Sequence, residues 1–386
     1  MTAKIIVAII EPVGAHGGMD YYDIGLCDGL VSANINPILY TSEPIHLNME
    51  NPISIKIFYK NIFGNVPAWI RGFYYLMGSI RSLLHAKING AKICHLHFFH
   101  IGILEFFNLI FARMLGAKVV VTAHDVQSFV DDLSIQVLAK VAYRLAHHII
   151  VHNQASQTEL IRVYGLPSKK VSVISSGNYL HAVGPLPSQI EARKQLNVPS
   201  DAKVILFFGQ IKKVKGLDIL IRAFKIVQET LPNTYLVIAG RPWKDDLSVY
   251  TKMITGLGIG QCIRSFFKFI PDSDMPTFFS AADLIVLPYR KIYQSAVMLM
   301  AMSYGKAALV SDLDAMKEII KDGETGYLFP SEDVSALARK VIEILSNQEN
   351  LHSVAAEGLE FIRREYSWKQ VGSATSSCYR ALLKSI

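Results

Sequence analysis

Charged residues are scarce in this chain of 386 residues: Asp, Glu, Lys and Arg together make up 18% of it, against about 25% in an average soluble domain. Hydrophobic types reach 51%. This balance excludes an intrinsically disordered chain, which needs low hydrophobicity and high charge to stay unfolded. At about 100–200 residues per domain, the length predicts two domains. Basic residues nevertheless exceed acidic ones by 39 to 32, which gives a net charge of +7.

Cysteine is also scarce, and the four cysteines lie far apart in the chain: Cys27, Cys94, Cys262 and Cys378. Their spacing fits neither a disulfide framework nor a zinc site, so we expect a reducing, cytoplasmic location. Long apolar runs are absent. The run at 5–10 is too short for the core of a signal peptide and is typical of a buried strand. Because no stretch reaches about 18 uninterrupted apolar residues, the sequence predicts no membrane-spanning helix.

Acidic residues are missing between Glu50 and Glu105, where basic and aromatic residues occur together. The basic ones are Lys56, Lys60, Arg71, Arg81, Lys87 and Lys92, and the aromatic ones are Phe58, Tyr59, Phe63, Trp69, Phe73, Tyr74 and Tyr75. This mixture suits peripheral contact with an anionic membrane, at the inner membrane face. The alternative is an ordinary basic surface whose rings turn into the core. Nucleic acid fits less well because the basic surplus is modest, and we expect no nucleic-acid partner.

Continuous apolar runs alternate with longer segments of helical periodicity. The runs lie at 5–10, 38–40, 93–98, 119–122, 148–152, 171–174, 204–208, 236–239, 263–267, 284–287, 307–310 and 326–329. Runs without in/out alternation are typical of parallel strands that are covered on both faces. The pattern therefore predicts an α/β protein with parallel sheets.

The periodicity lapses between Gly177 and Lys203, a stretch with three prolines, and a fresh strand follows. We therefore expect an N-terminal domain at 1–180, a linker at 181–202, a C-terminal domain at 203–365 and a terminal helix at 366–386. Ligands of open parallel sheets bind outside the carboxyl ends of the strands. Two such sheets facing each other would form an interdomain cleft.

Two segments of the C-terminal domain place free backbone amides after a predicted strand. The first runs from Gly209 and Gln210 through Lys215 to Gly216 and is followed by a helix. Helix amino termini and lysines attract phosphate, although a solvated lysine turn would look the same. In the second segment, Ser295 is placed to cap a helix that Gly305 ends.

Two segments of the N-terminal domain also follow predicted strands. His124 comes directly after the run at 119–122, where its nitrogens could bind a hydroxyl or a developing charge, or serve a structural role. Gly17 and Gly18 lie in a loop after the first strand and permit close approach to a phosphate or sugar. The fingerprints G-x-G-x-x-G after a strand, G-x-x-x-x-G-K-[ST], H-E-x-x-H and G-x-S-x-G are absent.

The order of these and further motifs resembles glycosyltransferase family 4 (group 1), the retaining GT-B enzymes that use nucleotide-sugar donors. The motifs are Phe208-Gly209-Gln210 to Lys215-Gly216, Val237 to Gly240, Phe269-Ile270-Pro271, Ala281 to Asp283, Leu287 to Tyr289, Ala301 to Gly305, Ser311-Asp312, Glu318 to Ile320 and Asp322 to Gly326. The resemblance covers about 203–366 well and is thinner in the amino half. It implies a GT-B fold with two Rossmann-like domains, the first for the acceptor and the second for the donor.

The resemblance also implies a site. His124 would be the catalytic residue and contact the donor sugar, and Gly17 and Gly18 would border the diphosphate. Lys215 and the amides of Ser295, Ala296 and Val297 would bind the diphosphate, beside Gln210. The base would lie against Phe269 and Ile270. No metal or other cofactor is expected, because lysine and amide dipoles would offset the charge of the leaving diphosphate. The sugar would be transferred with retention.

The sequence departs from the family pattern at functional positions. Gln210 stands where the family has an arginine, and Ile292 and Met300 replace its glutamate pair. The leading hypothesis is a hexosyltransferase that acts on a glycan or lipid-linked acceptor in cell-envelope or exopolysaccharide synthesis. The departures motivate an alternative, a non-catalytic GT-B protein that binds a sugar nucleotide or a partner enzyme. An epimerase or phosphorylase of the same architecture fits the motif order less well.

Overall fold

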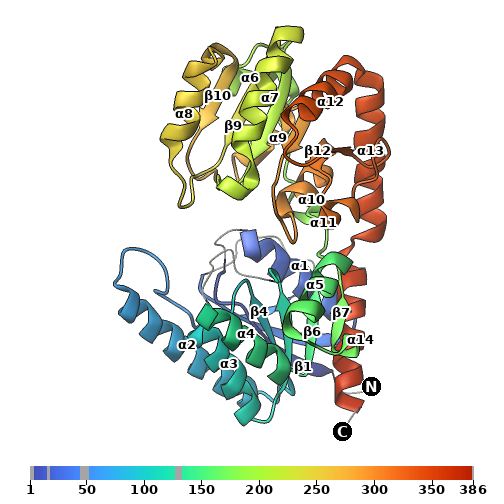
Figure 1. Cartoon of the computed structure of the whole chain (residues 1–386). Helices are drawn as coiled ribbons and strands as arrows, with labels where there is room; N and C mark the ends of the chain where they lie inside the picture. The colour runs from blue at the N-terminus through green and yellow to red at the C-terminus, as the bar shows by residue number, and fades with distance from the viewer. Residues whose placement is uncertain (1–3, 15–17, 44–51, 127–132, 385–386) are drawn as a thin grey trace. The chain divides into compact units, whose positions relative to one another are not determined.

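The computed structural model describes residues 4–14, 18–43, 52–126 and 133–384. The chain forms two compact units, one of residues 1–177 together with 366–386 and the other of residues 178–365 (Figure 1). Each unit is an α/β layer structure built on its own parallel sheet. The predicted fold class, α/β with two Rossmann-like parallel-sheet domains, is therefore confirmed.

The first unit has a sheet of seven strands in the order β3-β2-β1-β4-β5-β6-β7, and every pairing is parallel. The strands are β1 (Ile5–Ile10), β2 (Ile35–Thr41), β3 (Ser54–Ile57), β4 (Ile93–Phe98), β5 (Lys118–Ala123), β6 (His148–Val151) and β7 (Val171–Val173). The helices are α1 (Met19–Ser32), α2 (Ala68–Ile88), α3 (Ile103–Met114), α4 (Leu133–Leu145), α5 (Gln154–Tyr164) and α14 (Trp368–Lys384). Helices α2, α3 and α4 lie side by side (Figure 1).

The second unit has a parallel sheet of six strands in the order β10-β9-β8-β11-β12-β13. The strands are β8 (Lys203–Phe208), β9 (Thr234–Ala239), β10 (Ile263–Phe266), β11 (Leu284–Leu287), β12 (Ala307–Ser311) and β13 (Tyr327–Phe329). The helices are α6 (Gln189–Gln195), α7 (Leu217–Thr230), α8 (Leu247–Gly256), α9 (Met275–Ala281), α10 (Ala296–Ser303), α11 (Asp314–Lys317), α12 (Val334–Ser346) and α13 (Gln348–Glu365).

Each predicted apolar run overlaps a strand of the structure, and the runs at 5–10, 93–98 and 284–287 match strands residue for residue. These strands are buried in both sheets, which explains their uninterrupted apolar character. The sequence missed β3 at the edge of the first sheet. All four of its residues are half-buried or exposed, so it carries no apolar run.

The terminal helix α14 packs against α1 in the first unit. Tyr22 and Leu26 of α1 and Trp368 and Tyr379 of α14 share one core cluster with residues of β1, β4 and β5. The stretch 181–202, expected as a linker, contains α6, which packs on α9 in the second unit. There the Arg193 guanidinium binds both carboxylate oxygens of Asp283, at 2.9 and 2.8 Å.

Both sheets reverse their strand order at one point, between β1 and β4 in the first unit and between β8 and β11 in the second. The loops that leave neighbouring strands in opposite directions open a crevice at such a switch point, outside the carboxyl ends. The segments that follow β1, β4, β8 and β11 are therefore the candidates for ligand binding.

Candidate functional site

The first candidate site lies at the carboxyl ends of β4, β5 and β6, where three histidines form a row. His97 is on β4, His124 follows β5 and His152 follows β6. His124 Nε2 is 3.2 Å from His97 Nδ1, and His124 Nδ1 is 3.1 Å from His152 Nε2. At its far end, His152 Nδ1 is 3.1 Å from the carbonyl oxygen of Ile174. Both ring nitrogens of His124 are therefore engaged.

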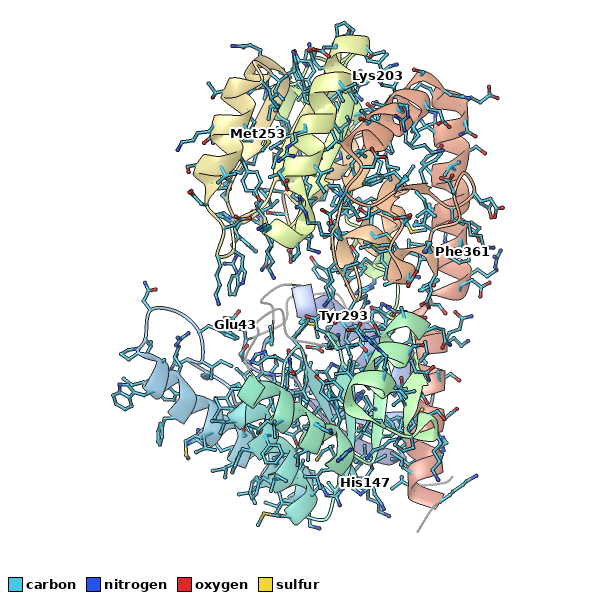
Figure 2. All side chains as sticks on the ribbon, in the orientation of Figure 1. Glu43, His147, Lys203, Met253, Tyr293 and Phe361 are labelled. Atoms are coloured by element: carbon cyan, nitrogen blue, oxygen red, sulfur yellow. The ribbon has the colours of Figure 1, made fainter. Side chains whose placement is uncertain are left out.

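Packing restrains the histidine row from several elements. The ring of Tyr22 on α1 stands edge-on to His97, His124 and His152, with ring centroids 5.4, 5.0 and 5.6 Å apart. Phe99 stacks on His124 at 4.7 Å. Below the row, His95 Nδ1 is 2.6 Å from the Tyr379 hydroxyl, so α14 also reaches this cluster. His147, at the amino end of β6, lies at the opposite edge of the sheet (Figure 2).

Burial keeps the row uncharged at neutral pH. Burial, and then the neighbouring histidines, hold the pKa values of His97 and His124 well below the ordinary value. Burial lowers the pKa of His152 to about 4. A neutral imidazole has one donor and one acceptor nitrogen. His124 can thus bind a sugar hydroxyl through nitrogen only by exchanging one of its two present hydrogen bonds.

A pair of buried carboxyl groups lies after β1, and the sequence analysis missed it. Glu11 accepts hydrogen bonds from the amides of Val13 at 3.0 Å and Gly14 at 2.7 Å. Burial raises the pKa of Glu11 to about 7, and burial together with Glu11 raises that of Asp23 on α1 well above its ordinary value. A charged residue directly after a buried strand, as Glu11 is, was the signal that could have revealed the pair.

The glycine loop after β1 is described only in part. Gly18 has φ +78° and immediately precedes α1, so its left-handed backbone starts the helix that carries Tyr22. Gly17 lies outside the described residues, and its expected contact with the diphosphate stays a prediction.

The second candidate site lies after β8 and β11 in the other unit, where Lys215 and Gly216 form a turn before α7. Gly216 has φ +67°, and a Cβ there would lie 1.8 Å from the carbonyl oxygen of Pro288. Only glycine allows this contact between the two loops. It brings Lys215 Nζ to 3.7 Å from the ring centre of Tyr289. In Figure 2, Lys203 and Tyr293 lie at opposite edges of this unit, because Lys203 begins β8 and Tyr293 follows the end of β11.

The amino terminus of α10 adjoins this lysine turn. The Ser295 side chain caps the helix by accepting the amide of Met298 at 3.2 Å, as predicted. Helix geometry gives the preceding amides of Ala296 and Val297 no acceptor within the helix. A Cβ on Gly209 would lie 3.2 Å from the Val297 side chain, so the start of the lysine loop and the first turn of α10 are neighbours. This arrangement can bind an anion.

The same two loops are connected by an ion pair, which the sequence analysis missed. Arg290, two residues past Pro288, donates to the two carboxylate oxygens of Asp218 at 2.8 and 2.7 Å and to the carbonyl oxygen of Lys213 at 2.8 Å. Its own amide donates to the carbonyl oxygen of Val214. Arg290 thus ties the turn before α7 to the end of β11 and fixes where Lys215 stands.

The remaining predicted residues are placed as follows. Gln210 is half-buried and follows Gly209 directly. Phe269 and Ile270 follow β10, which is separated from β8 by β9, so they are not part of the lysine turn. The Phe269 ring is exposed and Ile270 is buried. Trp243, which the sequence analysis missed, is half-exposed, with Lys212 Nζ 5.6 Å from its ring centre.

The two positions at which the family has glutamates hold the apolar residues Ile292 and Met300, and neither side chain is exposed. Met300 is buried within α10, and Ile292 is half-buried in the loop before it. Among the described residues, no group of three or more His, Cys, Asp or Glu side chains has a metal-binding arrangement. In the same part of the chain, no helix is long and apolar enough to cross a bilayer.

Two family models match the chain. "Glycosyltransferase Family 4" matches residues 16–178 and "Glycosyl transferases group 1" matches residues 188–360. The two matches correspond to the two units and include both candidate sites. The chain belongs to the group 1, family 4 glycosyltransferases.

Curated relatives of this chain are distant. The D-inositol 3-phosphate glycosyltransferase of Thermobispora bispora is 25% identical over 63% of this chain and 58% of its own length. The lipopolysaccharide 1,2-N-acetylglucosaminetransferase of Salmonella typhimurium is 31% identical over 53% of this chain and 55% of its own length. The chain thus spans about half the length of the curated relatives it matches.

Among solved structures, this chain is similar to Anabaena HepE, which was crystallised in complex with UDP and glucose. The TM-score is 0.78 at 17% identity, with 98% of this chain and 100% of that chain covered. Likeness at this level of identity concerns the fold, and it agrees with two units that are each built on a parallel sheet.

Proposed function

We propose that this protein is a retaining glycosyltransferase that moves a sugar from a nucleotide-sugar donor to a glycan or lipid-linked acceptor in cell-envelope or exopolysaccharide synthesis. The observation that carries the proposal is the anion site of the second unit. The loop from Gly209 to Lys215 and the first turn of α10 are neighbours, through Gly209 and Val297, at the switch point of that unit's sheet. A leaving nucleoside diphosphate is the anion that a family member would bind there.

In the proposed reaction, each of the two units binds a different substrate. The second unit, with Gln210, Lys215 and the amides of Ser295 to Val297, binds the donor, whose base rests near Phe269 and Ile270. The first unit supplies His124 and binds the acceptor. Transfer breaks the bond between the anomeric carbon and the diphosphate oxygen, and the acceptor oxygen bonds to the same face of that carbon. Lysine and amide dipoles stabilise the negative charge that develops on the leaving group.

The proposed reaction uses no metal ion and no other cofactor. The positive charge of Lys215 and the dipole of α10 do the work that a divalent cation does elsewhere. Protein treated with EDTA is therefore expected to keep the same rate of nucleotide release. A loss of activity that Mg²⁺ or Mn²⁺ restores would contradict this part of the proposal.

Lys215→Ala is expected to weaken nucleotide binding by about tenfold to a hundredfold, since a hydrogen bond to a charged group contributes about 1.5–3 kcal/mol. A thermal-shift panel of UDP-, GDP- and ADP-sugars identifies the donor, and UDP-glucose is tested first because HepE binds UDP and glucose. Lys225→Ala is the matched control, because Lys225 lies further along α7 and pairs with Glu229 on its surface. Equal affinities of the two variants would contradict the assignment of Lys215.

Release of free nucleotide separates a transferase from the alternative, a non-catalytic protein that binds sugar nucleotide or a partner enzyme. The apolar Ile292 and Met300, in place of two glutamates, favour that second candidate. Slow hydrolysis of one donor, abolished by His124→Ala, supports the enzyme. Binding without any turnover supports the alternative.

The exposed face of α2 supports contact between this enzyme and an anionic membrane. Trp69 and Phe73 are 76% and 57% exposed, and Leu84 and Ile88 at the other end of α2 are also exposed. At 3.6 residues per turn, these four side chains share one side of the helix with Arg81 and Lys87. Figure 2 shows their helix at the edge of the first unit, with side chains projecting along its free side. Tyr59, in contrast, is buried, so the core interpretation holds for part of the segment.

Vesicle flotation tests this membrane contact. Wild-type protein is expected to float with vesicles that contain anionic phospholipid and to remain below with zwitterionic ones, because apolar insertion and cationic attraction act together. The variant Trp69→Ser/Phe73→Ser/Arg81→Gln is expected to lose most of the binding. Val249→Ser, which changes an exposed apolar residue of the other unit, is the control. Equal flotation of the triple variant and the wild type would overturn the proposal.

A further inference from the structure

The three histidines at the carboxyl ends of β4, β5 and β6 form a row with a direction. The Ile174 carbonyl oxygen can only accept a hydrogen bond, so the hydrogen between it and His152 lies on His152 Nδ1. His152 is neutral at pH 7, which makes its Nε2 an acceptor. The hydrogen in the next contact, 3.1 Å long, must then come from His124 Nδ1.

The same reasoning extends to the other end of the row. Since His124 is neutral and carries its hydrogen on Nδ1, its Nε2 is an acceptor. The hydrogen of the 3.2 Å contact therefore lies on His97 Nδ1. Within the described residues, the buried His97 Nε2 has no hydrogen-bond partner. Each hydrogen of the row thus points from β4 towards β6, and one carbonyl group sets the direction for all three rings.

We propose that His97 and His152 are positioning residues that fix His124 in its Nδ1-protonated tautomer, with the lone pair on Nε2. They act on opposite nitrogens of one ring, from the two strands that flank β5. Tyr22 and Phe99 limit rotation of that ring from its edge and its face. The link between tautomer and turnover rests on the proposed function, in which His124 acts on the donor sugar. The tautomer itself does not depend on it.

The tautomer can be read directly from the wild-type protein. In ¹⁵N-histidine-labelled full-length protein at pH 7, long-range ¹H–¹⁵N spectra distinguish a protonated ring nitrogen from an unprotonated one. We expect a protonated Nδ1 and a bare Nε2 at His124, His97 and His152, assigned by single substitutions. A His124 that is protonated on Nε2, or that exchanges between tautomers, would overturn the inference.

Two substitutions of His152 separate positioning from packing. In His152→Gln, the amide group can still accept from His124 and donate to Ile174, so the tautomer is expected to persist and kcat to stay within about threefold of wild type. In His152→Leu the acceptor is lost, and we expect mixed tautomers and a fall in kcat of about 10- to 100-fold, the usual effect of removing a group that orients a functional histidine. His352→Gln, at an exposed histidine of α13, is the control.

The outcomes keep this inference apart from the proposed function. If His152→Leu keeps the wild-type tautomer and kcat, His152 is not a positioning residue. If the tautomers behave as expected but no sugar donor is turned over by the wild type, the proposed function fails and the tautomer assignment stands. His97→Leu serves as a second variant should His152→Leu not fold. It removes the donor to His124 Nε2, and it is expected to lower kcat and leave the Nδ1 proton in place.

Discussion

Gly372→Ala is expected to destabilise the first unit by about 3 kcal/mol, at the upper end of what overpacking normally costs. Gly372 lies in α14, where a Cβ would come within 2.0 Å of the backbone carbon of Gly29 in α1. Because the Gly29 carbon is helix backbone and the new Cβ is attached rigidly to another helix backbone, no side chain can move aside to make room. The helices would have to separate, and the Trp368 ring, which fits against Gly25 and Gly177, would lose its contacts.

The matched control for this substitution is Gly72→Ala in α2. A Cβ on Gly72 meets no atom within 4 Å, so only helix propensity changes. It is expected to stabilise the protein by up to about 1 kcal/mol. Urea unfolding followed by the fluorescence of Trp368, with the exposed Trp69 and Trp243 replaced by phenylalanine, measures both effects. The same sign for both substitutions would show that α1 and α14 do not pack as closely as described.

Acid is expected to destabilise the first unit between pH 6.5 and 4.5. Burial lowers the pKa of His95 to about 3 and that of His152 to about 4, and holds those of His97 and His124 well below the ordinary value. In this range the unfolded chain takes up protons at these positions and the folded chain does not. Stability is therefore lost as the pH falls below 6.5, and each buried histidine contributes to the loss in the same direction.

The buried carboxyl groups act in the opposite direction. Because the folded-state pKa values of Glu11 and Asp23 are raised, the folded chain holds protons that the unfolded chain releases, and their contribution to stability grows as the pH falls. They offset part of the histidine effect, and because four histidines oppose two carboxyl groups, the expected net result is still a loss of stability. Asp23→Asn removes part of this offset and should make the protein more sensitive to acid.

Denaturant unfolding at several pH values tests this balance. The expected result is a free energy of unfolding that falls from pH 7 to 4.5, more steeply in Asp23→Asn than in the wild type. His352→Gln should leave the pH dependence unchanged, because its side chain is exposed. A free energy that is flat or rising towards pH 4.5 would mean that the four histidines are not buried as described.

Local sequence patterns predicted the architecture because they depend on neighbours along the chain. Strands that are buried on both faces need continuous apolar runs, so β1, β4 and β11 could be read residue for residue. Ser295 could be assigned as a helix cap for the same reason, since the cap and the amide it accepts are three residues apart. Edge strand β3, with little apolar surface to bury, left no such pattern.

For the site residues too, features that depend on neighbours along the chain were predicted, and contacts between distant segments were missed. The lysine turn and the start of α10 were found as separate segments, and their contact through Gly209 and Val297 depends on the parallel pairing of β8 with β11. Arg290 and Asp218 were missed because they are 72 residues apart in the chain. His124 was singled out, but the sequence gives no indication that its two nitrogens are occupied.

The amino-acid sequence by itself determined two parallel α/β sheets, the turns that follow their strands and membership of a glycosyltransferase family. Each of these features depends on local periodicity or on the order of motifs along the chain. Only the tertiary structure decided which of those turns meet, which carboxyl groups share a buried site and which way the histidine row is protonated. The carbonyl group of Ile174 accepts from a histidine 22 residues earlier in the chain, and parallel neighbours in a sheet are always separated by a crossover of this kind.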